Sequence, residues 1–208
     1  MKTNYAINIG RQLGSGGREI GEHLAQKLQI PFYDKELITL ASKESGLAKE
    51  FFEKADEKTG FPFTSTLFGL RSTFIGDELI DNYLGNESLF RIQSDVIRGL
   101  NQSTSCVFVG RCADYILRDN PLAINIFICA DLEDRIIRVS ERNQLPEKKA
   151  KELIEKTDKK RASYYNYYTS KKWGKADSYH LCFNSSIGVN NSVEFIEEYI
   201  KYKIGDIL

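Results

Sequence analysis

The chain has 208 residues, of which 41% are hydrophobic, which is enough for one or two domains with a full core. Its 29 Lys and Arg residues balance 29 Asp and Glu residues, so a small-molecule ligand is a better expectation than nucleic acid or an acidic membrane surface. The sequence shows no signal peptide, membrane-spanning run, C-x-x-C motif or Cys/His cluster, so we expect a cytoplasmic protein without a zinc site or a disulfide framework.

A glycine-rich segment follows the first apolar run of the chain. Residues 5–9 predict a strand, and residues 10–25 read G-R-Q-L-G-S-G-G-R-E-I-G-E-H-L-A. The glycines let backbone N–H groups converge on one anion at the positive end of the helix that follows. The segment therefore predicts a phosphate-binding loop, and the alternative is a turn without a ligand. The residues of this predicted loop are Gly14, Ser15, Gly16, Gly17, Arg18 and Glu19.

The loop departs from the usual pattern G-x-x-x-x-G-K-[ST]. If Gly16 is the second glycine, Arg11 stands at the position of the first glycine and Gly17 at that of the lysine. Arg18 favours a ligand, because a guanidinium in the first turn of a helix opposes the helix dipole unless an anion shares the site. We expect Arg18 to take over the contacts to the β- and γ-phosphates, whereas Glu19 could contact a metal ion or repel the phosphates.

The remaining strands are predicted at residues 30–34, 106–109, 124–129 and 179–183, and helical patterns separate them. The run 106–109 is apolar without alternation, as expected of a strand buried on both faces. We predict an α/β fold, namely a doubly wound five-stranded parallel sheet with helices on both faces. Its ligands should bind beyond the carboxyl ends of the strands, where Arg11, Asp34 and Arg111 lie. Arg111 would there either form a structural ion pair with a residue such as Asp34 or clamp the phosphate of an acceptor.

Residues 47–58 also have a helical pattern, and residues 59–85 have no clear pattern. The latter segment holds several phenylalanines among glycines and hydroxyl groups. It would suit a flap over a pocket, a surface for a partner or a packed irregular loop.

Two charged helices are predicted near the carboxyl half of the chain. Asp131 should cap a helix at residues 132–142, which places Arg135, Arg138 and Arg142 on one face. A solvated face is the ordinary explanation of such a pattern. A second helix, from Glu147 to about residue 168, leads into a basic stretch rich in tyrosine. Such a stretch could suit single-stranded nucleic acid, but the balanced total charge favours a lid over a nucleotide.

Four stretches together resemble the cytidylate kinase-like proteins, which are relatives of the nucleoside monophosphate kinases. They are G-S-G-G-R-E-I at 14–20, P-F-Y-D-K-E-L-I at 31–38, V-G-R-C-A-D-Y-I-L at 109–117 and the arginine-bearing helices at 131–161. The resemblance implies a single P-loop kinase-like domain over residues 1–208. It also implies a helical acceptor-binding segment at about 35–104 and a lid at about 138–172. Here Cys112 stands where true cytidylate kinases have the aspartate of their G-R-D stretch.

The implied activity is transfer of the γ-phosphate of ATP, with Mg²⁺, to a nucleoside monophosphate, namely CMP or dCMP. The resemblance implies Asp34, Arg111 and Asp114 at the acceptor site. It implies Arg138 and Arg161, together with Arg18, at the transferring phosphate, and we expect Asp158 to orient Arg161. No residue is assigned to a metal, and the protein should be a monomer or a homodimer.

Two other functions are compatible with the sequence. One is a nucleotide-binding module without turnover, which the missing loop lysine favours. The other is a kinase of another small metabolite.

Overall fold

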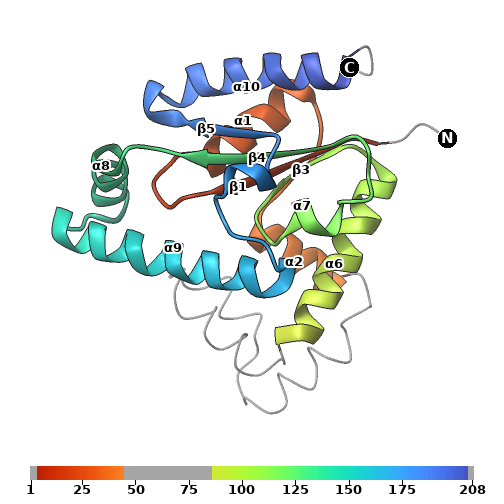
Figure 1. The fold of residues 1–208 in the computed structure, drawn as a ribbon, viewed down its shortest axis with the longest axis horizontal. Helices are drawn as coiled ribbons and strands as arrows, with labels where there is room; N and C mark the ends of the chain where they lie inside the picture. Colours follow the sequence, from red (N-terminus) through yellow and green to blue (C-terminus); the bar gives the residue numbers. More distant parts are fainter. Residues whose placement is uncertain (1–3, 45–85, 206–208) are drawn as a thin grey trace. The chain divides into compact units, whose positions relative to one another are not determined.

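The computed structural model describes residues 4–44 and 86–205, and the five strands found there form one parallel sheet in the order β2-β3-β1-β4-β5 (Figure 1). This confirms the predicted fold class. The strands are β1 (Ala6–Arg11), β2 (Phe32–Tyr33), β3 (Cys106–Val109), β4 (Ala123–Cys129) and β5 (Leu181–Asn184).

Helices connect the strands. They are α1 (Gly17–Leu28), α2 (Lys35–Glu44), α6 (Asn86–Ser103), α7 (Ala113–Ile116), α8 (Leu132–Asn143), α9 (Glu147–Thr169) and α10 (Val189–Ile204), with short 3₁₀ turns at Ala176–Ser178 and Ser185–Ile187. The predicted helix at 47–58 and the segment 59–85 lie outside the described residues. None of the described helices combines the length and the apolar composition that a membrane crossing needs.

The two faces of the sheet differ in chemistry. Ile7 and Ile9 of β1 join the valines of β3 and the isoleucines of β4 in a core with α1 and α10, which lie along one side of the sheet (Figure 1). Alternate residues point to the opposite face. There Asn8 donates from Nδ2 to Oδ1 of Asn125 over 2.9 Å, between strands paired in register. A polar pair therefore lies inside an otherwise apolar layer.

By its internal contacts the chain divides into two units. The first, here called the sheet unit, consists of Met1–Lys35 and Leu100–Leu208, and the second is Glu36–Gly99. The second unit holds most of α2 and α6. Every contact described below lies within the sheet unit.

The strand order creates a topological switch point between β1 and β3. The chain leaves β1 through α1 towards β2 on one side, and it leaves β3 through α7 towards β4 on the other side. The two connections therefore run in opposite directions, and ligands of such sheets bind in the crevice at the carboxyl ends of the strands.

Candidate functional site

The segment between β1 and α1 forms a tight glycine-dependent loop. Gly14 and Gly16 have φ angles of 81° and 72°, in the left-handed region that favours glycine, and Gly16 is the N-cap of α1. A Cβ atom on Gly14 would lie 2.7 Å from the carbonyl oxygen of Arg135. Ser15 is fully buried, and its hydroxyl donates to the carbonyl of Gln12 over 2.9 Å. The loop backbone is therefore fixed at the positive end of α1.

Helices α8 and α9 hold this loop by its main chain. Nε of Arg135 donates to the carbonyl oxygen of Leu13 over 2.8 Å, and Oδ1 of Asp158 accepts from the N–H of Leu13 over 2.8 Å. Arg135 and Asp158 also form an ion pair that is largely buried. Since Asp158 binds Arg135 and Leu13, our expectation that it orients Arg161 is wrong.

Two further arginines of these helices contact the same loop. Arg138 donates to the carbonyl oxygens of Gly14 and Ser185 over 3.3 and 3.4 Å, and Arg161 donates to that of Arg11 over 3.0 Å. Only Arg142 of the predicted arginine face is exposed. The solvated face is thus the wrong interpretation for Arg135 and Arg138, which bind the loop.

Arg18 and Asp34, both predicted site residues, lie side by side. Nε of Arg18 donates to Oδ2 of Asp34 over 2.8 Å, and Nη1 of Arg18 lies 3.1 Å from Oε2 of Glu22. Asp34 is only 3% exposed, whereas half of the Arg18 side chain is exposed. The arginine at the start of α1 therefore neutralises the carboxylate that follows β2.

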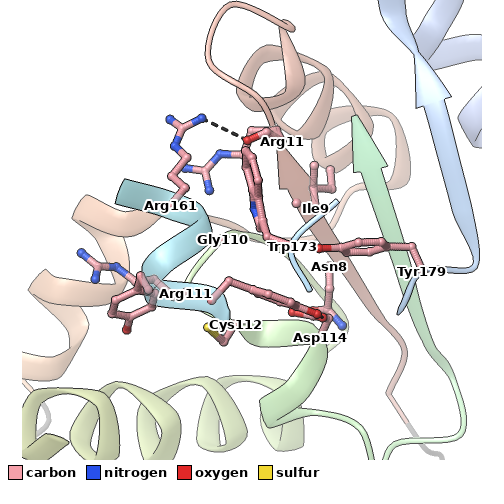
Figure 2. A pocket seen from close by; sticks show the side chains of 13 residues that line it. Asn8, Ile9, Arg11, Gly110, Arg111, Cys112, Asp114, Arg161, Trp173 and Tyr179 are labelled. Atoms are coloured by element: carbon pink, nitrogen blue, oxygen red, sulfur yellow. Dashed lines mark hydrogen bonds between the residues drawn. The ribbon is translucent and has the colours of Figure 1, made fainter. Parts of the chain in front are cut away.

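A cavity of about 60 Å³ lies at the switch point between β1 and β3 (Figure 2). Since one water needs about 10–15 Å³, the cavity has room for about four waters, which is space enough for one phosphate group. Among the described residues, three arginines line it: Arg11, Arg111 and Arg161. Arginine is a residue type that commonly binds phosphate, so the cavity is a candidate site for an anionic group.

Aromatic side chains form much of the remaining wall. They come from α9 and from the segment between α9 and β5: Tyr164, Tyr165, Trp173 and Tyr179. The guanidinium of Arg111 lies 5.5 Å from the ring centroid of Tyr164, which is a cation–π contact. Asp34 is engaged by Arg18, and the contact of the Arg111 guanidinium is with Tyr164.

The floor of the cavity carries a buried carboxyl group. Asp114 is 8% exposed and accepts a hydrogen bond from the hydroxyl of Tyr165 over 2.7 Å. Burial raises the pKa of Asp114, although the Tyr165 hydrogen bond and Lys171 act in the opposite direction. Burial also raises the pKa of the Cys112 thiol, so Cys112 is neutral and adds no charge.

Replacing Asp114 by asparagine should change how stability depends on pH. Because the pKa of Asp114 is raised in the folded protein, the folded state holds a proton that the unfolded chain releases above about pH 4. The free energy of unfolding should therefore fall as the pH rises through this range. Asparagine does not titrate and can still accept from Tyr165, so D114N should flatten the fall. Urea denaturation across a pH series measures it, and an unchanged slope in the variant would refute the assignment.

Asn8 is a cavity residue that the sequence did not single out. It is 2% exposed, and its Oδ1 atom has no hydrogen-bond partner among residues 4–44 and 86–205. An unsatisfied buried acceptor costs about 1–3 kcal/mol, so a donor from a ligand or water is expected there. The sequence did carry a signal for Asn8, because it is a polar residue in an apolar strand directly before the glycine loop.

Comparisons with known proteins agree with this geometry. The sequence model of the cytidylate kinase-like family matches residues 6–187. A comparison with curated protein sequences gave no significant match. Among solved structures, an uncharacterized protein from Eubacterium ventriosum is 30% identical, with a TM-score of 0.70 over 95% of this chain and 99% of that chain.

Two shikimate kinases share the fold at lower identity. The enzyme from Bacteroides thetaiotaomicron is 13% identical, with a TM-score of 0.53 over 95% of this chain and 98% of that chain. The enzyme from Acinetobacter baumannii, solved in complex with shikimate, is 15% identical, with a TM-score of 0.52 over 96% and 94%. The family match covers most of the chain, so the chain belongs to the cytidylate kinase-like family and is a kinase-like nucleotide-binding protein.

Proposed function

We propose that the protein transfers the γ-phosphate of ATP to a nucleoside monophosphate, namely CMP or dCMP. The observation that carries the proposal is the phosphate-sized cavity with Arg11, Arg111 and Arg161 in its wall, beside a glycine loop at the start of α1. Membership of the cytidylate kinase-like family supports the choice of acceptor. In the reaction the bond between the γ-phosphorus and the β–γ bridging oxygen breaks, and an oxygen of the acceptor phosphate forms the new bond.

The residues of the site would act by positioning and by neutralising charge, which is most of what phosphoryl transfer requires. The N–H groups of the loop and the dipole of α1 would hold the ATP phosphates. Arg138 and Arg161 bind the loop main chain, and their guanidinium groups would act beside the transferring phosphate. Arg111 would hold the acceptor phosphate, which is already ionised and therefore needs no general base.

The side chains of the described residues suit a Mg²⁺ ion that is held mainly by the phosphates of the nucleotide. No group of three or more His, Cys, Asp or Glu side chains that could hold a metal occurs in the described part of the chain. Mg²⁺ in kinases is commonly held by one or two carboxylates, substrate phosphates and water. Glu19, exposed in the first turn of α1, is a carboxylate that could contribute. When bound with ATP, the ion supplies charge neutralisation at the β- and γ-phosphates.

Arg111→Lys should weaken acceptor binding roughly tenfold, because lysine keeps the charge but loses the two-pronged contact and the stacking on Tyr164. Steady-state kinetics would show this as a raised KM for the acceptor. Arg118→Lys is a matched control, since Arg118 stacks over Tyr115 at 4.5 Å and is exposed. Equal acceptor KM values for R111K and the wild type would remove Arg111 from the acceptor site.

The acceptor can be identified by measuring ADP production with ATP and Mg²⁺ across CMP, dCMP, UMP, AMP, GMP and shikimate. We expect CMP or dCMP to give the highest kcat/KM. A higher value for shikimate would favour a kinase of another small metabolite. ATP binding by calorimetry without ADP production from any acceptor would favour a binding module. We further propose that the protein acts in the cytoplasm, as a monomer or homodimer, without nucleic-acid or membrane partners.

A further inference from the structure

The side chain of Arg11 runs past two glycines, and the first of them is Gly17. A Cβ atom on Gly17 would lie 2.6 Å from Cβ and 3.2 Å from Cγ of Arg11. Gly17 is the first residue of α1 and is not among the glycines with positive φ, so its backbone conformation does not demand glycine. What demands glycine is the space that the Arg11 side chain fills, together with Ile128, whose Cβ lies 3.2 Å from the same point.

The second glycine lies at the guanidinium end of Arg11. A Cβ atom on Gly110 would lie 2.1 Å from Nη1 and 3.1 Å from Cζ of Arg11. Gly110 directly follows β3, and both residues line the cavity. Figure 2 shows Arg11 at the wall of this cavity, with Arg161 hydrogen-bonded to its main chain. The guanidinium of Arg11 is therefore brought from the end of β1 to the end of β3.

These contacts explain why the loop departs from the usual pattern: the glycine and the cation have exchanged positions. In the usual pattern a glycine stands where Arg11 is, and a lysine stands where Gly17 is. Here the cation comes from the first position, and the second position is empty because the stem of that cation passes over it. Any side chain at position 17, lysine included, would displace Arg11.

We propose that Arg11 is the cation that contacts the transferred phosphate in place of the missing loop lysine. The proposal rests on the proposed function. Two observations carry it: the stem of Arg11 passes over Gly17, the position of the usual lysine, and its guanidinium reaches Gly110 in the wall of the cavity that Arg111 and Arg161 also line.

The steric part of the proposal can be tested without any ligand. Gly17→Ala should lower the Tm by roughly 2–10 °C, because overpacking a tight site is destabilising. The same substitution in an Arg11→Gly background should cost clearly less, since R11G removes the Cβ and Cγ atoms that clash. Arg11→Ala would keep the Cβ atom that clashes, so it is not a suitable background for this comparison. An equal Tm loss in both backgrounds would overturn the packing of Arg11 against Gly17.

The catalytic part is tested by kcat for phosphate transfer. We expect R11G to lower kcat about 10²–10³-fold, G17K alone to lower it also, and the double variant R11G/G17K, which restores the usual loop pattern, to regain at least about tenfold over R11G. Arg118→Ala, an exposed arginine outside the cavity, should leave kcat unchanged.

The outcomes separate this proposal from the one on which it rests. Suppose that the wild type transfers phosphate, that R11G keeps the wild-type kcat and that R18A loses it. Arg18 is then the cation, so the proposal for Arg11 is overturned while the proposed function stands. If the wild type neither binds ATP nor transfers phosphate, both proposals fail. A kcat lost in R11G and partly regained in R11G/G17K supports both.

Discussion

Arg161→Ala should lower kcat about 10³-fold and change the KM for ATP much less. Arg161 reaches the cavity from α9 and donates to the carbonyl oxygen of Arg11, so its guanidinium lies where the transferring phosphate is expected. An arginine that acts mainly on the charge of the transition state contributes to kcat more than to ground-state binding. Steady-state kinetics with ATP and CMP varied separately would measure both constants.

The control for this prediction is Arg142→Ala. Arg142 lies in the last turn of α8, belongs to the same arginine-rich helix pair and is exposed. Its loss removes the same charge without touching the cavity, so kcat should remain near that of the wild type. If R161A and R142A have the same small effect, α8 and α9 support the loop structurally and take no part in transfer.

Asp158→Ala should lower the free energy of unfolding by about 3–5 kcal/mol, the usual cost of removing one partner of a buried ion pair. The side chains of Arg135 and Asp158 are only 7% and 15% exposed. The variant would leave the charge of Arg135 buried without its carboxylate and would leave the N–H of Leu13 without its acceptor. Urea denaturation monitored by circular dichroism would measure the loss, and the loop should become accessible to protease.

Glu152→Ala provides a matched control on the same helix. Glu152 pairs with Lys149 over 2.9 Å, but both side chains are more than half exposed, so the loss should be within about 0.5 kcal/mol. The loss of unfolding free energy in Asp158→Asn should lie between those of D158A and E152A, because the asparagine side-chain oxygen can still accept from the N–H of Leu13. Equal losses for D158A and E152A would show that α9 does not anchor the loop.

The strands were predictable where the sequence pattern is local. The unalternating apolar run Cys106–Val109 is β3 with the predicted bounds, since parallel strands covered on both faces carry few polar residues. β2 is shorter than predicted, because only Phe32 and Tyr33 pair with β3. The short helix α7 was not predicted. It begins after Cys112, a non-glycine residue with φ of 56°, and no sequence signal marks such a start.

Several positions of the candidate site were predictable from the sequence, but their contacts were not. The glycine loop, Arg111, Asp114 and Arg161 were singled out from the sequence, and the last three do line one cavity. The pairing of Arg18 with Asp34 was not foreseen, because ion-pair partners far apart in sequence depend on how α1 packs beside β2. Arg11 was placed at the carboxyl end of the first strand but given no contact to a phosphate, since the space that its side chain fills is defined by Gly17 and Gly110 together.

Phosphorus NMR of the wild-type protein with ATP, Mg²⁺ and CMP follows the fate of the γ-phosphate directly. We expect the two phosphate signals of CDP to grow at the rate at which the γ-phosphate signal of ATP declines, with little inorganic phosphate. Growth of inorganic phosphate without CDP, or an unchanged ATP spectrum under conditions in which ATP is bound, would contradict transfer to a nucleoside monophosphate.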